Sequence, residues 1–171
     1  MSSSSLSASE FNPYYSSYIE KAQSFDLLKG LEESKEEIVE LLNSIPEAKQ
    51  HYSYAEGKWT TKEVVQHLLD SERVFAYRAL RIGRGDKTPL PGFEQDDYIV
   101  PSNANKREWH EMIEEYKIIR RSSQILFETF TSEQLLYMGS ASGSNVSVRA
   151  LGYIIIGHEQ HHAQIIRSRY L

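Results

Sequence analysis

Apolar side chains recur every three or four residues in four stretches of the chain, which is the spacing of amphipathic helices. The stretches span about residues 27–42, 60–82, 109–130 and 148–171. The second stretch opens with a serine/threonine-x-x-glutamate capping box, from Thr60 to Glu63. No stretch alternates apolar and polar residues in the manner of a strand, and no segment is repeated. The pattern therefore predicts an all-α protein.

The connection between the second and third stretches is long. Residues 85–104 contain Pro89, Pro91, Gly92 and Pro101 and show no helical periodicity. A connection of this length allows the third helix to start at either end of a bundle. Because the chain is long enough for one core but not for two, we predict a single four-helix bundle domain over residues 13–171. We expect residues 1–12 to be a flexible serine-rich tail.

Composition narrows the range of partners. The 171 residues carry a net charge of −5, and the 19 basic residues are scattered among 24 acidic ones, which argues against nucleic-acid binding. No apolar run approaches the roughly 18 residues that a membrane helix needs. The opening residues lack the basic and apolar regions of a secretion signal, so we expect a cytoplasmic protein. The chain has no cysteine, so any metal must be held by nitrogen and oxygen.

The candidate chemistry lies in the fourth stretch, which contains HEQHH at residues 158–162. On a helix, His158 and His162 lie only about 40° apart, one turn above the other. Both fall in the middle of the apolar stripe, whereas His161 falls at its edge. An aliphatic stripe offers few hydrogen-bond partners to two imidazoles, but one cation satisfies a ring nitrogen of each. We interpret the pair as metal ligands; the alternative is two core histidines held by hydrogen bonds.

The same residues match the HExxH pattern of zinc peptidases. The extended form of that pattern requires glycine at the position of Ile165 and histidine at that of Ser168, so the peptidase interpretation fails. A third ligand must come from upstream, and His67 in the second stretch is the best candidate because it borders the apolar arc. His51 and His110 have polar surroundings in the sequence, and we expect them to be exposed.

The chain also resembles a known family. The resemblance runs from about Tyr14 to the end and is carried by the segments YAEGKWTTKEVVQHLLDSERVFAYRALRIGRGDKTPLPGFEQDDY and GHEQHHAQIIRSRYL. These are similar to the DinB-like superfamily of metalloenzymes, which includes the bacillithiol S-transferases. The resemblance implies an up-down-down-up bundle, often a homodimer, with nickel or zinc on three histidines that match His67, His158 and His162. It also implies water in an open coordination position, and it does not imply DNA binding.

Three functions are compatible with such a site. A metal with an open position could activate a small thiol for transfer to an electrophile, or a water molecule for hydrolysis. The third alternative is a metal-binding stress protein without turnover. Arg78 could hold a carboxylate of the thiol or form a salt bridge, and Glu159 could act as a base or only orient a neighbour. Glu72 projects into the apolar arc and requires a buried partner such as an arginine.

Overall fold

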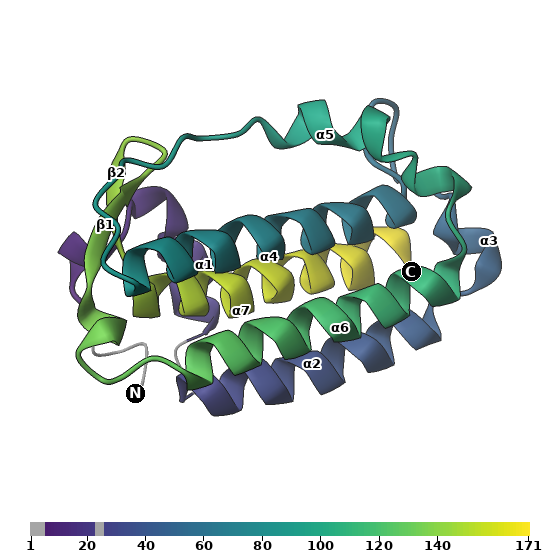
Figure 1. The fold of residues 1–171 in the computed structure, drawn as a ribbon. Helices are drawn as coiled ribbons and strands as arrows, with labels where there is room; N and C mark the ends of the chain where they lie inside the picture. The colour runs from purple at the N-terminus through teal and green to yellow at the C-terminus, as the bar shows by residue number, and fades with distance from the viewer. Residues whose placement is uncertain (1–5, 23–25) are drawn as a thin grey trace.

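The fold is a bundle of four long helices (Figure 1). A computed structural model describes residues 6–22 and 26–171. In that part of the chain the long helices are α2 (Leu27–Ser44), α4 (Thr61–Gly83), α6 (Trp109–Glu128) and α7 (Val148–Ile165), the last continued by a π-helical turn, Ile166–Tyr170. Helices α2 and α7 run in one direction and α4 and α6 in the other. The predicted all-α, up-down-down-up bundle is confirmed. None of the helices in the described residues has the length and hydropathy to cross a membrane.

The connection from α4 to α6 passes back along the bundle (Figure 1). It contains the short helix α5 (Gln95–Ser102) and a 3-10 turn, Ala104–Lys106. Helix α5 packs on α4, so the connection covers part of the helix that carries His67. A further short helix, α3 (Glu47–Gln50), follows α2.

A β-hairpin lies between α6 and α7, where the sequence predicted no strand. Strands β1 (Met138–Ala141) and β2 (Ser144–Ser147) pair antiparallel, and Leu90 of the long connection bridges to Ala141. Four residues per strand, with glycine and serine among them, are too few to show an alternating pattern. The turn residues Ser142 and Gly143 have φ values of 51° and 74°, as a tight hairpin turn requires.

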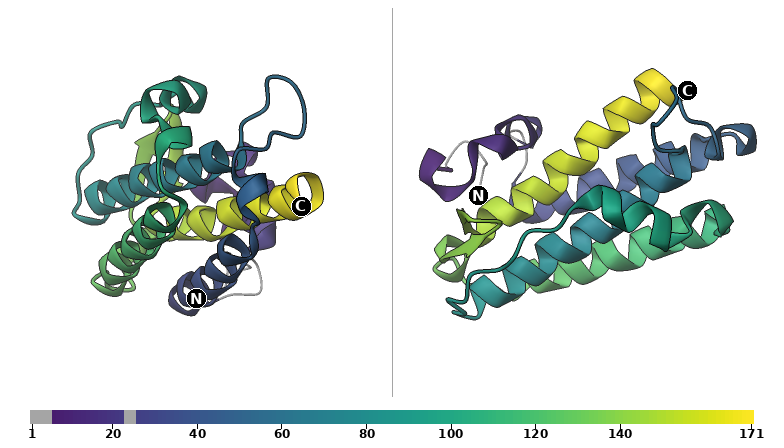
Figure 2. Two further views of the ribbon diagram at one scale, coloured as in Figure 1. Left: turned by 90° about the vertical axis from the view of Figure 1, so that its right-hand side faces the viewer. Right: turned by 90° about the horizontal axis from the view of Figure 1, so that it is seen from above.

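The N-terminal segment packs against the bundle. Residues 1–5 of the predicted flexible tail lie outside the described residues, but the rest of it makes specific contacts. Ser7 caps a 3-10 turn at Ala8–Glu10, and the buried Glu10 carboxylate accepts hydrogen bonds from Ser147 and Arg149. The segment continues through a 3-10 turn at Pro13–Tyr15 into α1 (Ser16–Lys21), which lies alongside α7 (Figure 2).

The bundle interior has two apolar clusters separated by polar side chains. One cluster gathers around Leu31, Phe127 and Ile154, and the other around Leu42, Leu69 and Met112. Between them lies the fully buried Arg120, with Glu72 and Glu159 on either side of its guanidinium. The candidate histidines occupy the same middle level, because His158 directly precedes Glu159 on α7.

Candidate metal centre

Local sequence signals place the histidines on facing helices. The predicted capping box is present: the Thr60 hydroxyl accepts from the Glu63 N–H and the Glu63 carboxylate accepts from the Thr60 N–H. The capping box fixes the start of α4 about two turns before His67. The Ser147 side chain caps α7 by accepting from the Ala150 N–H. Helices α4 and α7 pack against each other along their length, which brings His67 opposite the HEQHH segment.

The three predicted ligands form one cluster. One ring nitrogen from each of His67, His158 and His162 lies within 4.8 Å of the others, and Nε2 of His67 is 2.9 Å from Nε2 of His158. Histidine nitrogens bind zinc at about 2.0–2.1 Å, so two ligands of one ion lie at most about 4.2 Å apart. The measured separations come close to this requirement. Nδ1 of His67 lies 3.3 Å from the Ser71 hydroxyl, a contact that orients the ring.

Burial keeps these histidines uncharged at neutral pH. His67 and His158 are only 3% and 6% exposed. Loss of hydration lowers the pKa of His67 to about 4 and that of His162 to about 3, and it lowers the pKa of His158 well below its ordinary value. A metal ligand must present a lone pair, so three neutral imidazoles are a donor set that fits a divalent cation.

Aromatic side chains surround the cluster. Trp59 lies 4.9 Å from the His67 ring, and Tyr18 and Phe75 lie 5.4 and 5.8 Å from the His158 ring, measured between centroids. These apolar walls shield the imidazoles from water. They also limit the directions from which a ligand can approach.

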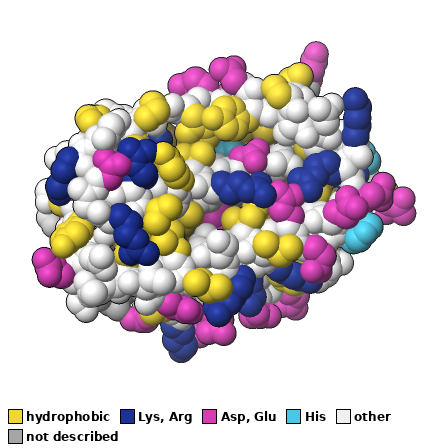
Figure 3. Space-filling model, in the orientation of Figure 1, with side chains coloured by type: hydrophobic (Ala, Val, Ile, Leu, Met, Phe, Trp, Pro, Cys, Tyr) yellow, Lys and Arg dark blue, Asp and Glu magenta, His cyan; other side chains and the backbone are white. Residues whose placement is uncertain are grey.

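Two cavities reach the cluster from different sides. A cavity of about 260 Å³ is lined by His158 together with Tyr15, Phe75 and Arg78. A second, of about 270 Å³, is lined by His162. Asp96 of α5 borders both. Figure 3 shows a histidine side chain recessed among hydrophobic and acidic side chains on the face that the long connection crosses. A small molecule can therefore reach the cluster without any rearrangement of the bundle.

The other histidines stay outside the cluster. His161 is half-buried and its ring lies 5.3 Å from that of Tyr18, but it does not belong to the group of converging nitrogens. His51 and His110 are exposed, as predicted.

Arg78 lies in the cavity that His158 lines, and it is 3% exposed. The alternative of a salt bridge is not seen, because no ion pair joins Arg78 to another of the described residues.

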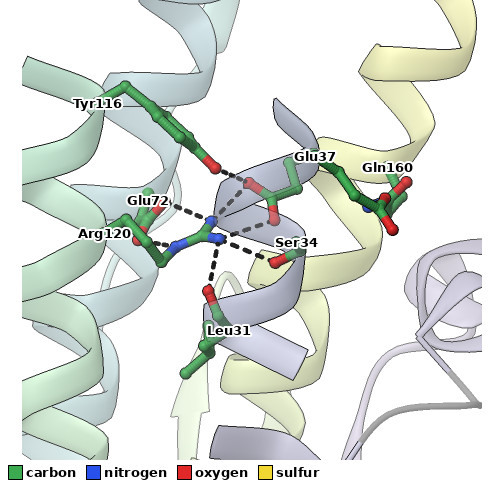
Figure 4. A network of polar contacts seen from close by, with 8 residues as sticks. Leu31, Ser34, Glu37, Glu72, Tyr116, Arg120 and Gln160 are labelled. Atoms are coloured by element: carbon green, nitrogen blue, oxygen red, sulfur yellow. Dashed lines mark hydrogen bonds and ion pairs between the residues drawn. The ribbon is translucent and has the colours of Figure 1, made fainter. Parts of the chain in front are cut away.

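Glu159 occupies a different environment from the one the HExxH analogy suggests. Its carboxylate accepts hydrogen bonds from Arg120 at 2.6 and 2.8 Å and from the Tyr116 hydroxyl at 2.8 Å. Figure 4 shows Arg120 and Tyr116 of this network. Both oxygens are therefore occupied in a buried network, and we do not assign Glu159 as a base. Arg120 also supplies the buried partner that Glu72 requires, through two hydrogen bonds of 2.9 Å.

Sequence reasoning missed the N-terminal wall of the site. Tyr15 and Tyr18 stand in a tyrosine cluster without helical periodicity, so nothing in the sequence placed them beside His158. Ser71 could have been found, because it follows His67 by one helical turn on the same face.

Three histidines that converge from two antiparallel helices of an up-down-down-up bundle form a candidate site for a divalent metal ion. The chain matches the family model of the DinB superfamily over residues 31–166, and it therefore belongs to that superfamily.

Two solved structures from Bacillus subtilis have the same fold. YfiT, described as "a probable metal-dependent hydrolase with an unusual four-helix bundle topology", is 18% identical, with a TM-score of 0.74 over 92% of this chain and 93% of that one. The DinB-like protein YjoA is 21% identical, with a TM-score of 0.59 over 82% of this chain and 86% of that one.

One curated relative is similar over part of its length. It is named "Putative metal-dependent hydrolase OB0413" and comes from Oceanobacillus iheyensis. The two sequences are 28% identical over 79 residues, which is 46% of this chain and 45% of the relative.

Proposed function

We propose that this protein is a metal-dependent enzyme that transfers a small thiol to an electrophile. In this proposal His67, His158 and His162 hold nickel or zinc. A divalent cation held there would supply Lewis acidity, which lowers the pKa of a thiol bound beside the histidines. The observation that carries the proposal is that His158 belongs to the histidine cluster and also lines a cavity large enough for a small molecule.

The chain's own residues prepare the reaction in two ways. His67 and His158 are buried and His162 is half-buried, so loss of hydration keeps all three neutral and they offer lone pairs at neutral pH. The aromatic side chains of Trp59, Tyr18 and Phe75 give the cluster apolar walls, which suit the apolar part of a small thiol. Since the chain contains no cysteine, the sulfur must arrive as a substrate. The thiol proton passes to solvent, the sulfur forms a bond to the electrophilic carbon, and the leaving group departs from that carbon with the bonding electrons.

Hydrolysis of an ester or amide is the second candidate. The descriptions of YfiT and of the Oceanobacillus iheyensis relative favour it, since both refer to metal-dependent hydrolases. The same histidines would serve both reactions, because the Lewis acidity of a divalent cation would activate water as it would a thiol.

One set of assays separates these candidates. The protein is purified without a histidine tag, its metal content is measured, and the zinc-loaded and nickel-loaded forms are tested. Thiol transfer is assayed with several low-molecular-weight thiols and 1-chloro-2,4-dinitrobenzene, and hydrolysis with 4-nitrophenyl acetate. We expect metal-dependent conjugation that His67→Ala abolishes and His161→Ala retains. Hydrolysis without conjugation would replace the first candidate by the second, and activity in neither assay would favour a metal-binding protein without turnover.

A further inference from the structure

Arg78 is a buried cation without an acidic partner. The residue is 3% exposed and lines the same cavity as His158, and its guanidinium stays charged in proteins. Nη2 donates to the carbonyl oxygen of Pro91 at 3.0 Å and to the Ser142 hydroxyl at 2.9 Å. The group also lies near the Tyr15 hydroxyl, whose pKa it acts to lower, and 5.8 Å from the centre of the Phe93 ring. All of these partners are uncharged.

The other arginines of comparable burial in the described residues are paired with glutamates. Arg120 contacts Glu72 and Glu159, and Arg149 contacts Glu10. A buried charge without a counter-charge is costly, because it loses hydration and gains no Coulomb attraction in return. Arg78 therefore differs from Arg120 and Arg149, because packing of the bundle supplies it with no glutamate or aspartate partner.

Three segments bring hydrogen-bond donors to this end of the cavity. Arg78 comes from α4, Tyr15 from the N-terminal segment and Ser142 from the β-hairpin turn. The Ser142 hydroxyl accepts a hydrogen bond from the guanidinium, so its own O–H is available to donate. Burial raises the pKa of Tyr15, which keeps its phenol protonated and able to donate. Arg78 itself retains the N–H groups of Nε and Nη1. Such a set matches the two oxygens of a carboxylate.

We propose that Arg78, Tyr15 and Ser142 form a binding site for a carboxylate of the substrate. The inference rests on the proposed function, because it assumes that the substrate occupies the cavity between this site and the histidine cluster. The substrate class is a small molecule with a single carboxylate at one end and the reacting thiol at the other. Glu94 and Asp96, which also line the cavity, disfavour a phosphate or another polyanion by like-charge repulsion.

Two thiols that differ only in charge test the site. N-acetylcysteine carries a carboxylate, whereas N-acetylcysteinamide carries a neutral amide in its place. Binding to the cobalt-loaded protein is followed by calorimetry and by the thiolate-to-cobalt absorption band. We expect the parent to bind the acid at least about ten-fold more tightly than the amide, as charge-assisted hydrogen bonds imply. Arg78→Gln is expected to bring this ratio close to one. Arg121→Gln, which removes an exposed arginine of α6, is the control and is expected to leave the ratio unchanged.

Two further variants guard against a folding defect in Arg78→Gln. Arg78→Lys keeps the charge but loses the planar fork, and Tyr15→Phe removes one hydroxyl. We expect each to lower the preference for the acid without abolishing binding of the amide. The carboxylate site would be overturned if the parent bound both thiols with equal affinity. It would also be overturned if the preference for the acid survived in Arg78→Gln, Arg78→Lys and Tyr15→Phe.

N-acetylalanine distinguishes failure of this inference from failure of the proposed function, because it has the carboxylate but no thiol. Binding of N-acetylalanine to the metal-free protein, weakened by the Arg78 variants, supports the carboxylate site even if no thiol reaches the cobalt. If both thiols give the cobalt band with equal affinity and N-acetylalanine does not bind, the carboxylate site is wrong while the metal-dependent function stands.

Discussion

Replacing Arg120 by methionine tests the buried network at the centre of the bundle. Arg120 is 0% exposed, and its guanidinium contacts Glu72 and Glu159 as well as the Ser34 hydroxyl at 3.0 Å (Figure 4). The two carboxylates come from α4 and α7, while Ser34 comes from α2. One side chain of α6 therefore connects all four long helices.

The expected loss of stability follows from the charges that remain. Arg120→Met leaves two glutamates, 5% and 3% exposed, without their cation. Removing one partner of a buried ion pair costs about 3–5 kcal/mol. For a chain of this size each kcal/mol lowers the melting temperature by about 2–4 °C, so we expect a decrease of about 6–20 °C. The free energy of unfolding is measured by urea denaturation of the metal-free protein.

Arg121→Met is the matched control. Arg121 is the next residue on α6, but its side chain is 59% exposed and its contact with Glu128 is 3.3 Å long. Exposed ion pairs contribute about 0–1 kcal/mol, so this variant is expected to resemble the parent. If the free energies of unfolding of Arg120→Met and Arg121→Met differ by less than about 1 kcal/mol, the buried network does not stabilise the fold.

Two further predictions concern the packing and the protonation of the site. Gly157→Ala places a Cβ against the Tyr18 carbonyl oxygen. We therefore expect the free energy of unfolding to fall by about 1–3 kcal/mol and proteolysis within residues 6–22 to become faster. An unchanged melting temperature and cleavage pattern would contradict the close packing of α1 on α7. The metal-free protein is expected to lose stability as the pH falls from about 6.5 to about 4. In this range the unfolded chain takes up a proton at His67, whereas the folded protein, in which the pKa of His67 is about 4, does not. This difference lowers the free energy of unfolding by about 3 kcal/mol. Urea denaturation at stepped pH checks this, and the same pH slope in His67→Gln would refute the assignment to His67.

Much of the bundle and of the candidate metal site could be predicted from the sequence. Helical periodicity and the capping box at Thr60 locate the long helices, because amphipathic helices carry their packing face in their own residues. The spacing of His158 and His162 on an apolar stripe indicates paired ligands for the same reason. The position of His67 then follows from the need for a third donor.

The features that the sequence did not predict depend on contacts between segments that are far apart in the chain. The sequence shows that Glu72 needs a buried partner, but Arg120 lies 48 positions away on another helix, and no local pattern connects them. The hairpin is missed because its two strands are stabilised by each other and by Leu90 rather than by a pattern of their own. Tyr15 reaches Arg78 only because the N-terminal segment packs beside α7.

Metal stoichiometry in two histidine variants tests the three-histidine centre most directly. Both His67→Ala and His161→Ala remove an imidazole from a helix, and both leave His158 and His162 in place. Only His67 belongs to the converging cluster. We predict that His161→Ala binds about one equivalent of zinc with the affinity of the parent, while His67→Ala loses most of its affinity for zinc. A His67→Ala protein that still binds one equivalent as tightly as the parent would contradict the site.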